Sequence, residues 1–445
     1  MAQTAWRLPS DAVMPPPLLM NPAAGALCYD ATPPLHVPLR FLFTAPLFGI
    51  AAGALLLAAP EALSSRWEPT AFALTHLVAV GFMLIVMFGA LFQILPVVGG
   101  VAVPGGQRFA GVVHGLLTAG AASLSWGLGS GQPFAIQAGG LLLALAVASF
   151  VLGVAIALWG SGIALDTQRD LRVALIGVVV AALLGLGLTL VLSRGVALPF
   201  GPLLELHVGW ALLGGAGMLL AATSWIVVPM FQITPAYPRV MTGWWGFAVA
   251  GALMLWSAAV ALDAAGIASA LLPLPLALAA AFAVATLVLQ QRSRRGAPDA
   301  TTRAFRVAML AFLAGLACVL VARHATEGRW AVMAGVLLLY GGFTGVIQGM
   351  LYRIVPFLCW LALSQAGLRA PNVKKLQPDR PVMLQARVHL AALLVALLAV
   401  VSGEPVLARL AGVLVAADFA WLLWIMAGVL RAHAAARGQG LRRKD

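Results

Sequence analysis

Twelve long apolar runs follow one another along this chain of 445 residues, and short polar segments separate them. Each run has about 20 residues or more, the length that an α-helix needs to cross the hydrocarbon core of a bilayer. Charged residues make up only 9% of the chain, whereas soluble domains carry about 25%. A β-barrel would need short alternating segments, so the pattern predicts an all-α integral membrane protein of about twelve transmembrane helices. The predicted spans are residues 40–60, 70–99, 108–129, 134–161, 171–193, 203–235, 241–263, 266–290, 304–323, 330–364, 383–402 and 405–431.

The lysines and arginines between these runs are unevenly distributed. Cytoplasmic loops of membrane proteins collect such residues, and we therefore expect both termini in the cytoplasm and a multi-pass protein of a bacterial inner membrane. The same bias accounts for the net charge of +13 without nucleic acid as a partner, because the basic loops lack interleaved aromatic residues. With this orientation the inner side holds most of the basic residues, and the outer side holds Arg66, Arg194, Arg323, Arg329 and Arg409.

The predicted domain organisation is a single membrane domain with short ends. Residues 1–39 are Pro-rich and lack the apolar stretch of a signal peptide, so we expect a cytoplasmic lead-in to the first helix. Residues 40–431 form the membrane domain, and residues 432–445 form a basic cytoplasmic tail. The three cysteines, Cys28, Cys318 and Cys359, predict neither a disulfide framework nor a zinc site. No common catalytic fingerprint is visible.

A short motif recurs once in every four predicted helices. Residues 92–96 read FQILP, residues 231–235 read FQITP and residues 352–356 read YRIVP. The shared pattern, aromatic-[Gln/Arg]-Ile-x-Pro, predicts three pseudo-repeats of four helices, at about residues 40–161, 171–290 and 304–431. A second alignment of the sixth helix, on residues 224–229 (SWIVVP), fits as well. Three ordinary helix ends, each with an interfacial aromatic residue and a helix-breaking proline, would give the same pattern.

Two histidines are the first candidates for chemistry. His76 lies early in the second predicted helix and His207 early in the sixth. Ionisable groups at membrane depth are costly and usually face a cavity, a cofactor or a partner, and histidine is a common ligand of haem and copper. We therefore predict that His76 and His207 bind a cofactor or metal. The alternative is that each is hydrogen-bonded to a neighbouring helix. His114 and His389 are expected at the membrane interface.

Two charged residues within predicted helices form a second candidate site. Asp418 lies near the middle of the twelfth helix and Arg353 lies in the tenth. Such charges pair with each other or belong to an ion path, and arginine can also extend to the interface. Asp418 and Arg353 are thus predicted to form either an intramembrane pair or part of a proton or ion path.

The arrangement resembles subunit I of the haem–copper oxidase and nitric oxide reductase superfamily. Residues 75–96 are similar to the second helix of the nitric oxide reductases, and residues 352–356 to the end of the family's tenth helix. The resemblance implies a twelve-helix, oxidase-like fold with His76 as a ligand of the low-spin haem and His207 as a ligand of the distal metal. The family's histidines on the seventh and tenth helices have no counterpart in residues 240–266 or 330–360. The layout also resembles the NnrS family of haem- and copper-containing membrane proteins.

Three functions follow from these features. The leading hypothesis is a protein that binds haem, copper or both, serves respiration or nitrogen-oxide metabolism, and lacks a complete oxidase centre, so that it is not itself an oxidase. The second is a transporter or channel for a small solute, a proton or a metal ion. The third is a cofactor-free scaffold that assembles with other respiratory membrane subunits.

Overall fold

The computed structural model describes residues 32–99, 102–159, 165–368 and 370–442, and all regular structure within them is helical. Twelve spans in this part of the chain are long and apolar enough to cross a membrane, which confirms the predicted number. Nine of the twelve spans, all but the second, sixth and tenth, form one group. They are α1 (His36–Ala58), α4 (Gly106–Ser130), α5 (Pro133–Trp159), α6 (Leu165–Arg194), α9 (Arg239–Ala261), α10 (Ala265–Leu271) continued by α11 (Pro273–Gln291), α12 (Ala300–His324), α16 (Asp379–Ser402) and α17 (Pro405–Arg442).

The second, sixth and tenth spans, here called the central helices, each consist of three segments. They are α2 (Pro69–His76), η3 (Leu77–Leu84) and α3 (Ile85–Gly99); α7 (Phe200–Gly209), η4 (Trp210–Gly217) and α8 (Met218–Gln232); and α13 (Arg329–Gly335), η5 (Val336–Thr344) and α14 (Gly345–Gln365). The most apolar windows of these spans are 67%, 61% and 61% buried, whereas no other span exceeds 50%. They therefore form the interior of the bundle.

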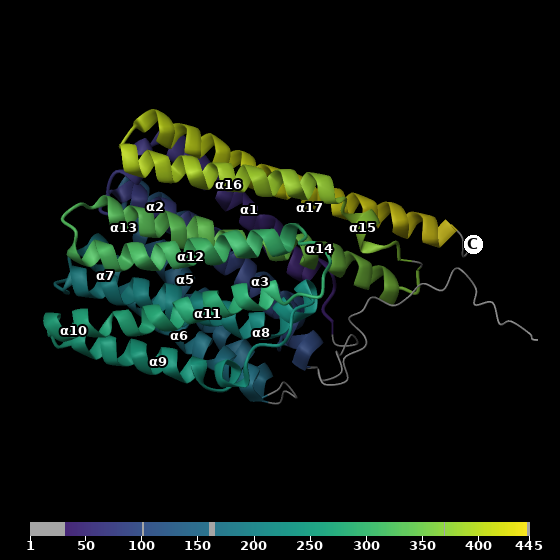
Figure 1. Ribbon diagram of the computed structural model, residues 1–445, viewed down its shortest axis with the longest axis horizontal. Helices are drawn as coiled ribbons and strands as arrows, with labels where there is room; N and C mark the ends of the chain where they lie inside the picture. Colours follow the sequence, from purple (N-terminus) through teal and green to yellow (C-terminus); the bar gives the residue numbers. More distant parts are fainter. Residues whose placement is uncertain (1–31, 100–101, 160–164, 369, 443–445) are drawn as a thin grey trace, which may run out of the picture.

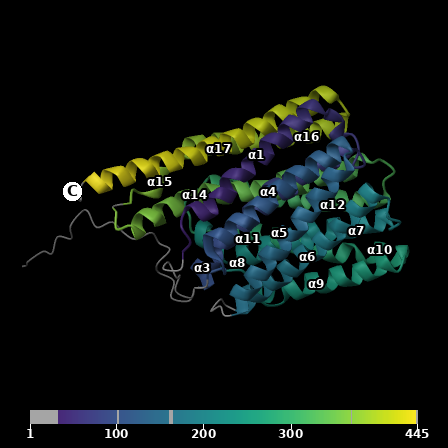
Figure 2. The ribbon, with the colours of Figure 1, turned by 180° about the vertical axis from the view of Figure 1, so that it is seen from behind.

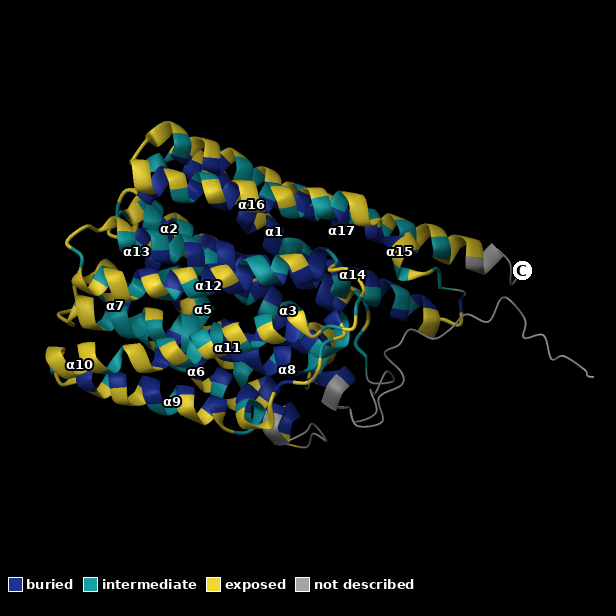
Figure 3. Cartoon of the chain, viewed as in Figure 1, coloured by how far each residue is buried: buried dark blue, intermediate teal, exposed yellow. Residues whose placement is uncertain are grey.

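The other nine spans surround the central helices as a closed ring, here called the outer ring. Its helices lie roughly parallel to the long axis of the molecule (Figure 1), and the view from behind shows the same arrangement (Figure 2). Exposed residues lie mainly on outward faces and buried residues on inward faces (Figure 3), as expected for helices with lipid on one side. Neighbouring helices contact each other around the ring in the order α1, α4, α5, α6, α9, α11, α12, α16 and α17, and α17 returns to α1.

Each central helix contains a π-helical segment in its first half. The segments begin at residues 77, 210 and 336, and a proline within the helix follows 19, 19 and 20 residues later, at Pro96, Pro229 and Pro356. Each proline has an aromatic residue four positions before it and a glycine fifteen positions before it. The proline inside the sixth span is therefore Pro229, since α8 ends at Gln232, before Pro235. π-Helical segments are uncommon and occur frequently at functional sites.

Several span boundaries differ from the sequence-based expectation, including those of the first and last spans. The first span begins at His36 rather than at residue 40, and the last helix continues to Arg442. Residues 432–442, predicted as a tail, thus extend α17 beyond the rest of the bundle (Figure 1), because no residue there interrupts the helix. Most of the Pro-rich N-terminal segment and Cys28 lie outside the described residues, and Cys318 and Cys359 are buried free thiols.

The first and last spans cross at glycines. A Cβ atom added to Gly53 of α1 would lie 2.4 Å from the backbone nitrogen of Ala416, and one added to Gly412 of α17 would lie 2.6 Å from the backbone nitrogen of Leu57. Small residues let helix backbones approach closely in membranes, so this crossing depends on the absence of side chains.

We predict that Gly53→Ala lowers the free energy of unfolding of the detergent-solubilised protein by about 1–3 kcal/mol, because the added methyl group meets backbone atoms that cannot move aside. Thermal unfolding measures the change. Gly115→Ala in α4 is the matched control, since a Cβ atom there meets nothing within 4 Å. Equal stability of the two variants would contradict the close crossing.

Candidate functional site

His76 is the last residue of α2, directly before the π-helical segment η3. Its Nδ1 lies 2.8 Å from the carbonyl oxygen of Phe72. A carbonyl oxygen can only accept, so Nδ1 carries the hydrogen and donates it. In the neutral ring, Nε2 is then left with its lone pair, which is the form in which histidine binds a metal.

His207 lies in α7 and is held in the same way. Its Nδ1 donates to the carbonyl oxygen of Ala181 in α6, at 2.9 Å. Gly185, one turn further along α6, leaves room for the ring, because a Cβ atom there would lie 3.0 Å from Cε1 of His207. Hydrogen bonds of this kind fix the tautomer and orientation of metal-binding histidines. Both imidazoles therefore present Nε2 as a free acceptor.

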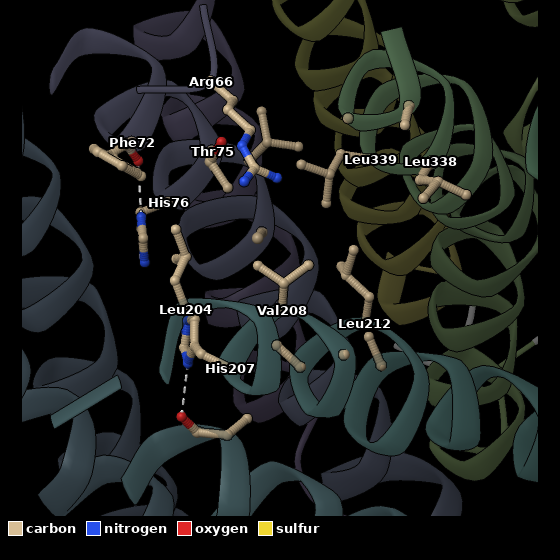
Figure 4. A pocket seen from close by; sticks show the side chains of 18 of the residues that line it. Arg66, Phe72, Thr75, His76, Leu204, His207, Val208, Leu212, Leu338 and Leu339 are labelled. Atoms are coloured by element: carbon tan, nitrogen blue, oxygen red, sulfur yellow. Dashed lines mark hydrogen bonds between the residues drawn. The ribbon is translucent and has the colours of Figure 1, made fainter. Parts of the chain in front are cut away.

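The structure brings His76 and His207 together. Their ring centres are 6.3 Å apart and their planes differ by 16°. Figure 4 shows that the Nδ1 atom of each ring is turned away from the other ring, so that the Nε2 edges face each other. A metal ion that lies directly between the two nitrogens, at about 2.0–2.1 Å from each, would place them about 4 Å apart. The distance between the ring centres is compatible with that requirement.

The two histidines border a cavity of about 860 Å³ between the central helices and the outer ring. This volume lies within the range of about 300–1,000 Å³ typical of ligand and cofactor sites. Most lining residues are apolar, and the polar ones include Arg66, Thr75, Glu205 and Arg323. Arg323 donates to Glu205 at 2.9 Å, and the Arg66 guanidinium lies 4.3 Å from the centre of the Trp67 ring. An apolar chamber with basic residues at one end is thus present.

The structure does not bring Asp418 and Arg353 together. Arg353 forms an ion pair with Asp299, the residue before α12, and Asp299 also binds Arg295 at 3.0 Å. Arg353 lies five residues of α14, about one and a half turns, beyond Gln348, which contacts Asp418, so its side chain meets the acidic residue at the end of the bundle. The predicted Asp418–Arg353 pair is therefore wrong.

Asp418 is instead surrounded by neutral donors. Its Oδ2 accepts from the Tyr340 hydroxyl at 2.9 Å, from Gln348 Nε2 at 2.8 Å and from His389 Nδ1 at 3.0 Å, and its Oδ1 accepts from Gln385 Nε2 at 2.6 Å. Asp418 is fully buried. These four donors come from the tenth and eleventh spans, and together they satisfy the carboxylate without a permanent positive charge.

Sequence reasoning missed the partners of Asp418. His389 was expected at the membrane interface, but its side chain is only 7% exposed. The sequence does contain an indication of a polar helix face at this position. Gln385 and His389 are four residues apart, and residues at this spacing share one face of a helix. His114, the other histidine expected at the membrane interface, is half-buried, and its Nε2 lies 2.9 Å from the hydroxyl oxygen of Thr44.

The set of possible metal ligands in the cavity is small. Among the described residues, no group of three or more His, Cys, Asp or Glu side chains is placed to hold a metal ion. The His76–His207 pair alone could therefore serve a metal that needs only two protein ligands. No protein-family model and no curated protein matches this sequence.

We predict a pH-dependent contribution of Asp299 to stability. Burial favours its neutral form, but the hydrogen bonds from Thr302 and the charges of Arg353 and Arg295 outweigh burial and lower the pKa of Asp299. The stabilisation is therefore complete above the unfolded-state pKa of about 3.9, and it is lost as the pH falls through the lower folded-state pKa. Asp299→Asn should cost about 1–3 kcal/mol at neutral pH.

Thermal unfolding in detergent from neutral pH down to about pH 3 tests this prediction, because the difference between Asp299→Asn and the unsubstituted protein should shrink at the acidic end. Asp263→Asn is the control, since Asp263 is exposed. A difference that does not change with pH would contradict the assigned role.

Proposed function

We propose that this integral, multi-pass membrane protein binds haem through His76 and His207 and serves respiration or nitrogen-oxide metabolism. The observation that carries the proposal is the facing pair of Nε2 atoms, each fixed by a hydrogen bond from Nδ1 to a backbone carbonyl. A haem supplies four nitrogen ligands of its own and needs at most two from the protein. When bound, its iron would supply one-electron transfer, or gas binding where one axial position is free.

The surroundings of the pair support this choice of cofactor. The cavity is large and mostly apolar, as a porphyrin requires, and Arg66 and Arg323 border it on the side where the central helices begin. Arginine binds carboxylates through two parallel hydrogen bonds, so these residues fit the propionate groups of a haem. Copper(I), which accepts few and soft ligands, is the alternative occupant, with Met83 and Met87 also lining the cavity.

An oxidase-like arrangement of three units of four helices is part of the proposal. It is supported by the central position of the second, sixth and tenth spans and by the π-helical segment that each of them contains. The common spacing from these segments to Pro96, Pro229 and Pro356 supports it further. The facing pair also departs from the resemblance, which assigned His76 and His207 to two separate centres.

The absorption spectrum of the protein purified from a haem-replete host, oxidised and reduced, tests the proposal together with metal analysis. We expect a Soret band that is lost or strongly shifted in His76→Ala and in His207→Ala, and retained in His114→Ala, which removes a histidine outside the cavity lining. Added imidazole should restore the band in His76→Gly. Stoichiometric copper without a Soret band would identify copper instead, and a protein free of both would refute the proposal.

A second candidate function is passage of a proton, a metal ion or a small solute. It is favoured by the cavity and by Tyr340, which borders the cavity and donates to Asp418. Flux into proteoliposomes that is lost in Asp418→Asn, in a protein without haem or copper, would support this function over cofactor binding.

We also propose that the end of the bundle with Arg295, Asp299 and Lys374 faces the cytoplasm of a bacterial inner membrane, because basic residues gather there. Reporter fusions that are active only in the cytoplasm test this orientation. A fusion after Arg442 should be active and a fusion in the loop after His324 inactive, and the reverse pattern would contradict it.

A further inference from the structure

A stripe of polar side chains runs along the tenth span through the interior of the bundle. Tyr340, Thr344, Gln348 and Tyr352 follow at intervals of four residues, and all four are buried. At about 1.5 Å per residue the stripe extends roughly 18 Å, more than half of a hydrocarbon core of about 30 Å. Tyr340 borders the main cavity, and Tyr352 borders a small hollow of about 30 Å³ near Arg353.

The middle of this stripe contacts the buried carboxyl group of Asp418. All four donors to Asp418 favour its ionised form, because each hydrogen bond is made to a carboxylate oxygen. None of the four carries a permanent positive charge. A charge at membrane depth without a counter-charge is costly, so the site favours any reaction that brings a positive charge next to Asp418.

His389 is the group that can supply this charge. Its Nδ1 is bonded to Asp418, whereas its Nε2 is buried and has no protein hydrogen-bond partner. Nε2 points toward Gly345, where an added Cβ atom would lie 3.4 Å from it. The hydroxyl of Thr344, the residue before Gly345, is likewise buried without a partner. A proton taken up by the lone pair of Nε2 turns the imidazole into an imidazolium and the Asp418–His389 pair into a neutral ion pair.

The other groups that face the pair do not compete for this role. The titratable side chains near Asp418 are Tyr340 and Tyr352 of the tenth span, together with His389 of α16. From α12, Ala308 packs beside Gly345, and from α1, Gly49 packs against Phe419, the residue after Asp418. These two helices thus bring apolar contacts to the pair.

We propose that Asp418 and His389 form a proton-binding site within the membrane, which binds the proton at Nε2 of His389. The site is independent of the haem proposed for His76 and His207. The proton adds to a lone pair, no other bond breaks, and the charge of the pair changes from negative to neutral.

Nitrogen NMR of the protein with ¹⁵N-labelled histidines, in lipid nanodiscs between about pH 5 and pH 9, tests the equilibrium. We expect one imidazole to change from the neutral Nδ1–H form to the imidazolium, and this signal to be absent in His389→Gln. Replacement of the other six histidines, one at a time, assigns the signal independently if His389→Gln does not fold. Asp418→Asn should lower the proton affinity of His389 about tenfold or more.

A single neutral form of His389 throughout this range, or an unchanged titration in Asp418→Asn, would overturn the proton-binding site.

Discussion

The absence of water in the hydrocarbon core controls every polar group in the interior of this bundle. Lipid offers no hydrogen bonds, so each such group must be satisfied by the protein or left unsatisfied at a cost. This constraint fixes the tautomers of His76 and His207, because each Nδ1 finds a backbone carbonyl. It also gathers four donors around Asp418. The few atoms left without a partner then stand out as places where a ligand or a proton can bind.

The π-helical segments place these groups in the central helices. Each segment has more residues per turn than an α-helix and changes the face that the following residues present. His76 lies directly before one segment, His207 lies within one turn of another, and Tyr340 lies within the third. The irregular stretch of each central helix thus coincides with a polar side chain that borders the cavity. A regular helix in the same position would not give the same alignment of these side chains.

Much of the fold could be predicted from the sequence, because the length of apolar runs follows directly from the thickness of a bilayer. The twelve spans were found in this way, with an error of four residues at the start of the first span and of eleven residues at the end of the last helix. The importance of His76 and His207 followed from the cost of polar groups in lipid. Their mutual contact could not be predicted, since it depends on how the central helices pack.

The environment of Asp418 shows where such reasoning stops. Arg353 was an obvious partner by charge, but a charge pair in a bundle is decided by rotation and depth along each helix. Tyr340, Gln348 and Gln385 carry no charge, so charge pairing does not point to them. Tyr340 and Gln348 are eight residues apart and Gln385 and His389 four apart, so each pair shares one polar face of its helix.

The contact between α1 and α17 has a consequence for how the protein is made. The outer ring closes only where the first span of the chain meets the last, at Gly53 and Gly412. Chains are synthesised from the N-terminus, so the interior stays open along one side of the bundle until α17 has been inserted. A chain that ends before α17 therefore lacks the helix that joins α1 to α16 and closes the ring.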